Sequence, residues 1–206
     1  SWLGVAALGV LKGDIDNLGE LFRIGLQQPT FAKHAALSRQ VNAFFAIYLP
    51  WLLAREFPKV YTVFAGGDDF FLVGPWRQVQ KLAWRMRCEF HRYVAENADL
   101  HFSAGIATQK PGAPVHVLAE LAEEALTQAK QCREPLSSAV QPAKNAVTCF
   151  GQTVPWQQWL HLEGAFDRLS SLRSDAGLST GYVYGLLQFV EMRQRERDGD
   201  PEAAMW

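Results

Sequence analysis

The sequence predicts an α+β fold in which an antiparallel sheet carries helices on one face. Short segments rich in β-branched and aromatic residues, which favour strands, alternate with longer segments whose apolar residues recur every three or four positions, as in amphipathic helices. Their order along the chain is β-α-β-β-α-β, followed by a helix and a strand. With 206 residues, 49% of them hydrophobic, the chain is long enough to bury one such core.

The expected elements follow in order from the N-terminus. Strand Val5–Leu11 comes first, and a long amphipathic helix over Leu37–Leu52 ends near Pro58, since proline stops a helix. Strands Tyr61–Ala65 and Phe70–Val73 flank a glycine-rich turn and form a hairpin. The remaining elements are helix Val79–Val94, strand His101–Ala107, helix Val115–Lys130 and strand Ala146–Phe150. This is the order of a ferredoxin-like palm, in which the first strand and the central hairpin are neighbours.

The sequence pattern changes after residue 152. Two stretches of helical spacing, Trp159–Leu169 and Val183–Val190, predict a helical hairpin in residues 153–206. We therefore expect two domains, residues 1–152 and residues 153–206.

Four carboxylates mark the expected functional centre. Asp68 and Asp69 follow two glycines at the tip of the hairpin, whereas Asp14 and Asp16 follow the first strand. Because Asp14 and Asp16 are two residues apart, a strand directs both to the same side. Adjacent carboxylates repel one another, and a bound cation relieves that cost. The pattern predicts a site for Mg²⁺ or Mn²⁺ with these ligands and the Ile15 carbonyl, although a structural role for Asp16 stays open.

Bulk composition narrows the classes of function. A formal net charge of −1 does not support a general nucleic-acid binder, which would be clearly basic. The three cysteines include no Cys-x-x-Cys pair, which argues against a zinc ribbon, and an odd number of them fits a reducing cytosol. No apolar run reaches the roughly 18 residues of a membrane span. We expect a cytoplasmic protein without membrane contact.

Several segments together resemble a known family. They are Leu11–Gly19, Leu37–Phe45, Val63–Asp69 and Phe102–Ile106, with Lys144-Asn145 just before the last predicted strand. In this order they resemble the second palm domain of the large subunit of type III CRISPR effector complexes, the Csm type in particular. Residues 153–206 resemble the start of that subunit's helical C-terminal domain.

The resemblance implies a nucleotidyltransferase that joins ATP into cyclic oligoadenylates. In that family the 3′-hydroxyl of one ATP attacks the α-phosphate of another, and pyrophosphate leaves. The implied partners are a second palm domain and other effector subunits with crRNA and target RNA. The isolated chain is expected to show no turnover if the second ATP sits on an absent palm. The sequence contains no His-Asp nuclease motif, so the family's DNase domain is expected to lie outside this chain.

Candidate nucleotide contacts surround the four carboxylates. Lys130, at the end of a predicted helix, and Lys144 are candidates for the triphosphate, although a lysine there also compensates the helix dipole. Ser38, Arg39 and Asn42 share one face of the first long helix, where local hydrogen bonding is an equal alternative. The other expected nucleotide-binding residues are Gly66 and Gly67 of the hairpin, and the expected catalytic residues are Asp14, Asp68 and Asp69.

Two other functions stay open at this point. One is a GGDEF-like diguanylate cyclase that acts as a homodimer on GTP, because Phe70 follows the acidic pair as in that family. The other is a non-catalytic palm that only binds nucleotide or scaffolds a ribonucleoprotein. Preference for ATP over GTP separates the synthesis of cyclic oligoadenylates from a diguanylate cyclase. Metal-dependent nucleotide binding separates both enzymes from the non-catalytic palm.

Overall fold

The computed structural model describes residues 5–25, 30–132 and 144–197. The chain divides into two compact units, residues 1–160 and residues 161–206. No helix in the described ranges is long and apolar enough to cross a membrane.

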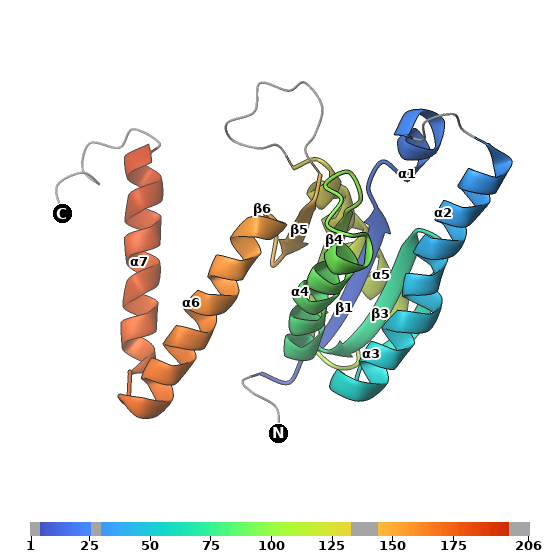
Figure 1. The fold of residues 1–206 in the computed structure, drawn as a ribbon. Coiled ribbons are helices and arrows are strands. Elements are labelled where there is room, and N and C mark those ends of the chain that lie inside the picture. Colours follow the sequence, from blue (N-terminus) through green and yellow to red (C-terminus); the bar gives the residue numbers. More distant parts are fainter. Residues whose placement is uncertain (1–4, 26–29, 133–143, 198–206) are drawn as a thin grey trace. The chain divides into compact units, whose positions relative to one another are not determined.

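The first unit is built on a six-stranded sheet in the order β2-β3-β1-β4-β5-β6 (Figure 1). Its strands are β1 (Leu8–Ile15), β2 (Tyr61–Gly66), β3 (Asp69–Pro75), β4 (Phe102–Gln109), β5 (Ala146–Cys149) and β6 (Gln152–Pro155). Strand β1 lies between β3 and β4 and is antiparallel to both, as the palm topology requires. The α+β palm class is therefore confirmed.

The sheet is mixed rather than purely antiparallel, because β5 runs parallel to β4. A parallel neighbour needs a crossover connection, and the helix between the two strands supplies it. Strand β6 was not expected from the sequence. It pairs with β5 through a tight turn in which Phe150 and Gly151 have φ values of 53° and 73°.

Helices connect the strands of the first unit. A continuous helical stretch comprises α2 (Phe31–Ala43), the π-helix η2 (Phe44–Tyr48) and α3 (Leu49–Glu56). The Thr30 hydroxyl accepts a hydrogen bond from the Lys33 backbone N–H and caps α2. The other elements are α1 (Leu18–Glu20), the π-helix η1 (Leu21–Gly25), α4 (Trp76–Tyr93) and α5 (Val115–Lys130).

The helices cover both faces of the sheet, not one. A Cβ placed on Gly9 of β1 would meet α4 at Val79, whereas a Cβ on Gly105 of β4 would meet the backbone of α5. Gly105 pairs with Lys12 of β1, and side chains alternate along a strand, so α4 and α5 lie on opposite faces. Figure 1 shows α4 in front of the sheet and α5 behind it. Lys12 and Asp14 of β1 therefore face α5.

Aromatic residues fill the core on the α4 face. Phe45 of η2 stacks on Phe70 of β3 with ring centroids 5.2 Å apart, and Phe70 meets Phe102 of β4 edge to face. All three side chains are fully buried. Since Phe70 directly follows Asp69, this packing anchors the start of β3.

Two helices end the described chain. Helix α6 (Trp156–Asp175) begins inside the first unit, where the buried Trp156 donates its Nε1–H to the Phe102 carbonyl over 2.8 Å. The second unit contains the rest of α6 and α7 (Thr180–Arg197), joined as the expected helical hairpin. Large apolar side chains of this unit, including Tyr184 and Phe189, are exposed.

Candidate functional site

Asp14 and Asp69 lie directly opposite each other in the sheet. They are paired residues at adjoining ends of the antiparallel strands β1 and β3. Paired residues project to the same face, and for this pair it is the face that carries α5. Like charges in such a pair destabilise a sheet unless a cation offsets them. We call Asp14, Asp68 and Asp69 the acidic edge.

The hairpin turn that carries this edge is shorter than the sequence suggested. Gly66 pairs with Asp69, which leaves only Gly67 and Asp68 between the strands. Gly67 has a φ of 67°, a conformation that glycine adopts without steric cost. Asp69 is therefore a strand residue, and Asp68 alone of the two carboxylates sits in the exposed turn.

Neighbouring elements hold the turn on two sides. The Ile15 backbone N–H donates to the Asp68 carbonyl over 2.9 Å and ties the turn to the end of β1. The Asn42 side chain of α2 accepts a hydrogen bond from the Gly67 N–H over 3.0 Å. Asn42 thus supports the backbone of the turn, and a role for the Ile15 carbonyl as a metal ligand stays a prediction.

Two lysines that the sequence named as candidates for the triphosphate lie at this edge. Lys130, at the C-terminal end of α5, forms an ion pair with Oδ2 of Asp14. Burial lowers the pKa of Lys130, and the charges of Lys144 and Lys12 lower it further. Lys12 itself pairs with Glu123 of α5. Three lysines therefore lie close enough to interact electrostatically beside two paired carboxylates.

Lys144 is held in an unusual backbone conformation. Lys144 and Asn145 have φ values of 50° and 47°, in the left-handed region that residues other than glycine seldom adopt. Nζ of Lys144 donates to Oδ1 of Asn17 over 2.6 Å, and Asn17 also has a positive φ. This contact fixes the Lys144 ammonium beside the segment that follows Asp14.

Asp16 differs from the other carboxylates. Asp16 is only 1% exposed. Its Oδ2 accepts hydrogen bonds from His101, Ser103 and the Asn145 backbone N–H. Oδ1 is also shielded from solvent. These contacts favour the structural alternative for Asp16 over metal ligation. His101 and Ser103 were missed as site residues, although a serine inside an apolar strand indicates a buried polar partner.

Ser38 and Arg39 lie farther along the exposed side of α2. Neither has a described contact with the acidic edge, and of the three helix candidates Asn42 alone reaches the turn. Their assignment to nucleotide binding stays a prediction.

The donor set of this edge fits a metal that binds together with a nucleotide. Within residues 5–25, 30–132 and 144–197, no group of three His, Cys, Asp or Glu side chains is arranged to hold a metal by itself. Mg²⁺ seldom uses an all-protein cage, because it retains waters and takes one or two carboxylates plus substrate phosphates. Asp14 and Asp69 supply such a pair of carboxylates.

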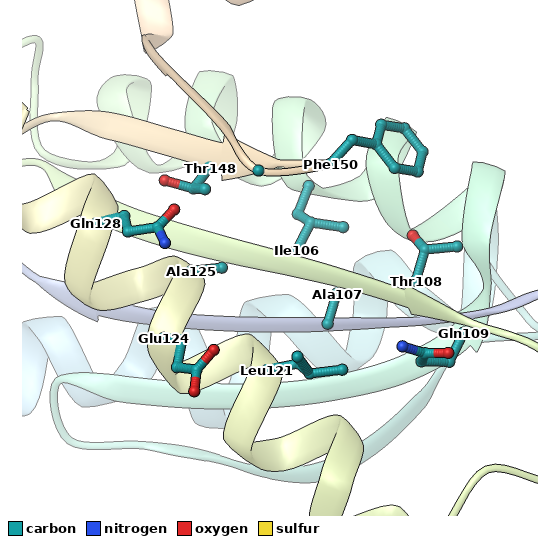
Figure 2. Close-up of a pocket in the computed structure, with 11 residues that line it drawn as sticks. Ile106, Ala107, Thr108, Gln109, Leu121, Glu124, Ala125, Gln128, Thr148 and Phe150 are labelled. Carbon is teal, nitrogen blue, oxygen red and sulfur yellow. The ribbon is translucent and has the colours of Figure 1, made fainter.

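A separate pocket of about 220 Å³ lies between α5 and strands β4 and β5. Figure 2 shows Glu124 and Gln128 of α5 on one side, with Thr108 and Thr148 on the strands. Glu124 is the one ionisable residue in its lining, so the pocket offers no cation to a phosphate. The lysines of the acidic edge make that edge, not this pocket, the candidate triphosphate site.

Comparison with known proteins identifies the family of this chain. The family model for the second palm domain of Cas10/Cmr2 matches residues 7–144. The chain belongs to this family. A relative from Methanocaldococcus jannaschii, named CRISPR system single-strand-specific deoxyribonuclease Cas10/Csm1 (subtype III-A), is 34% identical over 74% of this chain. The chain spans 21% of that relative's length.

Solved structures agree with the family assignment. A Csm1-Csm4 cassette in complex with cA3 superposes with a TM-score of 0.72 and 26% identity, over 94% of this chain and 30% of that one. A Csm1-Csm4 cassette in complex with one ATP gives a TM-score of 0.71 and 25% identity, over 97% of this chain and 31% of that one. The chain therefore contains a type III CRISPR palm domain, as its sequence motifs suggested.

Proposed function

We propose that this Cas10 palm domain binds ATP with Mg²⁺ or Mn²⁺ and contributes to the joining of ATP into cyclic oligoadenylates. The observation that carries the proposal is the pairing of Asp14 with Asp69 beside Lys130. Nucleotidyl transfer needs carboxylates for divalent ions and cations for a triphosphate, and positioning and electrostatics dominate its catalysis. Both sets of charges meet at the acidic edge.

Each residue has a distinct part in this proposal. Asp14 and Asp69 would hold the divalent ion, with Asp68 in the adjoining turn as the third carboxylate. The bound ion would neutralise phosphate charge and lower the pKa of the attacking 3′-hydroxyl. Lys130 and Lys144 would bind the triphosphate, and Lys130 would exchange its contact with Asp14 for one with a phosphate oxygen.

The wider setting is also a proposal. Csm1-Csm4 cassettes have been solved with cA3 and with one ATP, which supports adenine nucleotides as the ligands of this chain. We propose a complete site that includes a second palm, in a cytoplasmic effector complex with crRNA and target RNA. We also propose that residues 153–206 begin the helical domain that follows the palm.

Calorimetric titration of the chain with ATP and with GTP, each with and without Mn²⁺, tests the proposal. The expected result is Mn²⁺-dependent binding that favours ATP. Preference for GTP would support a diguanylate cyclase instead. The absence of binding for both nucleotides would refute nucleotide binding by this chain and leave a scaffold.

A further inference from the structure

A single buried carboxylate oxygen joins three segments of the sheet beside the acidic edge. Oδ2 of Asp16 accepts hydrogen bonds from His101 Nδ1 over 2.7 Å, from Ser103 Oγ over 2.9 Å and from the Asn145 N–H over 3.0 Å. Because a carboxylate only accepts, Nδ1 of His101 is the donor. A buried carboxylate is costly without such donors, and within the described residues all of them contact Oδ2, so the loss of any one should be felt.

The donors come from segments that are far apart in the sequence. Asp16 directly follows β1, His101 directly precedes β4, and Ser103 lies within β4. The backbone N–H of Asp16 also donates to the His101 carbonyl over 2.8 Å. Asn145 directly precedes β5. The Asp16 carboxylate thus fixes the start of β5 relative to the end of β1, where the metal-binding Asp14 of our proposal lies.

The segment that Asp16 fixes is the one that carries Lys144. Lys144 and Asn145 both have left-handed backbone conformations, which persist in residues other than glycine when surrounding contacts impose them. The hydrogen bond from the Asn145 N–H to Asp16 is such a contact. The hydrogen bond from Lys144 Nζ to Asn17 Oδ1 over 2.6 Å holds this ammonium beside the end of β1, and its charge lowers the pKa of Lys130.

We propose that Asp16, His101 and Ser103 form a positioning unit, and that it acts through Asn145 to place Lys144 for the triphosphate. Asp16 is then a positioning residue and not a metal ligand. This inference rests on the proposed nucleotide-binding function. We therefore expect that loss of the Asp16 carboxylate weakens the affinity for the triphosphate, which Lys144 contacts, and leaves the affinity for the metal unchanged.

A double-mutant cycle tests this coupling. Asp16→Asn and Lys144→Gln should each weaken Mn²⁺-ATP binding by about tenfold, the scale of one lost charge-assisted contact. If Asp16 acts through Lys144, the double variant should lose about tenfold rather than the hundredfold of independent sites. Additive losses in the double variant would overturn the proposal. Ser103→Ala, which removes one donor and keeps the carboxylate, should give a smaller loss in the same direction.

Two further titrations distinguish a positioning role of Asp16 from metal ligation and from a general loss of the folded site. Asp16→Asn should bind Mn²⁺ alone within about twofold of the parent, whereas the matched variant Asp14→Asn should lose Mn²⁺ binding. Binding of AMP should also change by no more than about twofold, since AMP lacks the β- and γ-phosphates. Loss of Mn²⁺ binding in Asp16→Asn, or equal losses for AMP and ATP, would contradict the inference.

Amide hydrogen exchange distinguishes failure of the inference from failure of the proposed function. If the parent chain binds no ATP, the nucleotide-binding function fails. Exchange at the Asn145 N–H still tests the positioning unit, because this amide donates to Asp16 in the absence of nucleotide. Faster exchange in Asp16→Asn and in Ser103→Ala is expected, and unchanged exchange would overturn the unit.

Discussion

Lys130→Met should change metal affinity and nucleotide affinity in opposite directions. In the structure the Lys130 ammonium pairs with Oδ2 of Asp14, so a divalent ion that binds this oxygen competes with the lysine. Methionine keeps most of the aliphatic length of lysine and removes the charge. The variant should therefore bind Mn²⁺ more tightly in the absence of nucleotide and bind Mn²⁺-ATP more weakly.

The sizes of the two effects follow from the exposure of the pair. The side chains of Lys130 and Asp14 are 33% and 25% exposed, so their ion pair is partly solvated. Such a pair contributes about 0.2–1 kcal/mol, which corresponds to about a 1.5- to 5-fold gain in Mn²⁺ affinity when it is removed. Loss of a charge-assisted contact to a phosphate costs about 1.5–3 kcal/mol, or about a 10- to 150-fold loss in ATP affinity.

Lys12→Met is the matched control. Lys12 lies on the same face of β1 but pairs with Glu123 of α5 rather than with an acidic-edge residue. Titration of free Mn²⁺, followed by its electron paramagnetic resonance signal, measures the metal affinity of each variant, and calorimetry measures ATP. Equal gains in Mn²⁺ affinity in both variants would assign the effect to net charge. Unchanged or weaker Mn²⁺ binding in Lys130→Met would refute the displacement of Lys130 by the metal.

Three further predictions concern the hairpin, the packing of α5 and the pH dependence of stability. Joint replacement of Asp68 and Asp69 by alanine should abolish Mn²⁺-dependent ATP binding, by calorimetry, with little change in melting temperature, because neither side chain belongs to the core. Gly105→Ala should lower the free energy of unfolding in urea by about 1–3 kcal/mol, because its Cβ would lie 2.3 Å from the backbone of α5, whereas Gly19→Ala, in open space, should not. Burial and a carboxylate neighbour raise the pKa of Tyr48 to about 12, above its ordinary value of 10.0. The folded chain therefore holds this proton more tightly, so stability should fall between pH 10 and 12, and less steeply in Tyr48→Phe.

Much of the fold and of the site could be derived from the sequence. Apolar periodicity reports whether a segment can form a strand or a helix, because each has its own repeat. The order of those segments then brings the end of the first strand beside the central hairpin. This reasoning placed Asp14 and Asp16 near Asp68 and Asp69, and the register of β1 and β3 pairs Asp14 with Asp69. Lys130 at a helix end was likewise found from the sequence, and it reaches Asp14.

Other features depend on contacts that no local pattern encodes. The pattern of a strand shows that it has two faces, but which helix covers each face depends on the path of the connections, so the expectation that the helices share one face was wrong. Likewise Asp14 and Asp16 are alike in the sequence, as two acids that follow one strand. Their environments differ because Asp16 meets donors from His101 and Asn145, which are 85 and 129 residues away. The sequence by itself determined most of the elements and that the end of the first strand meets the acids of the hairpin. Only the tertiary structure decided that Asp14 faces Asp69 and Lys130, and that Asp16 is buried among hydrogen-bond donors from distant segments.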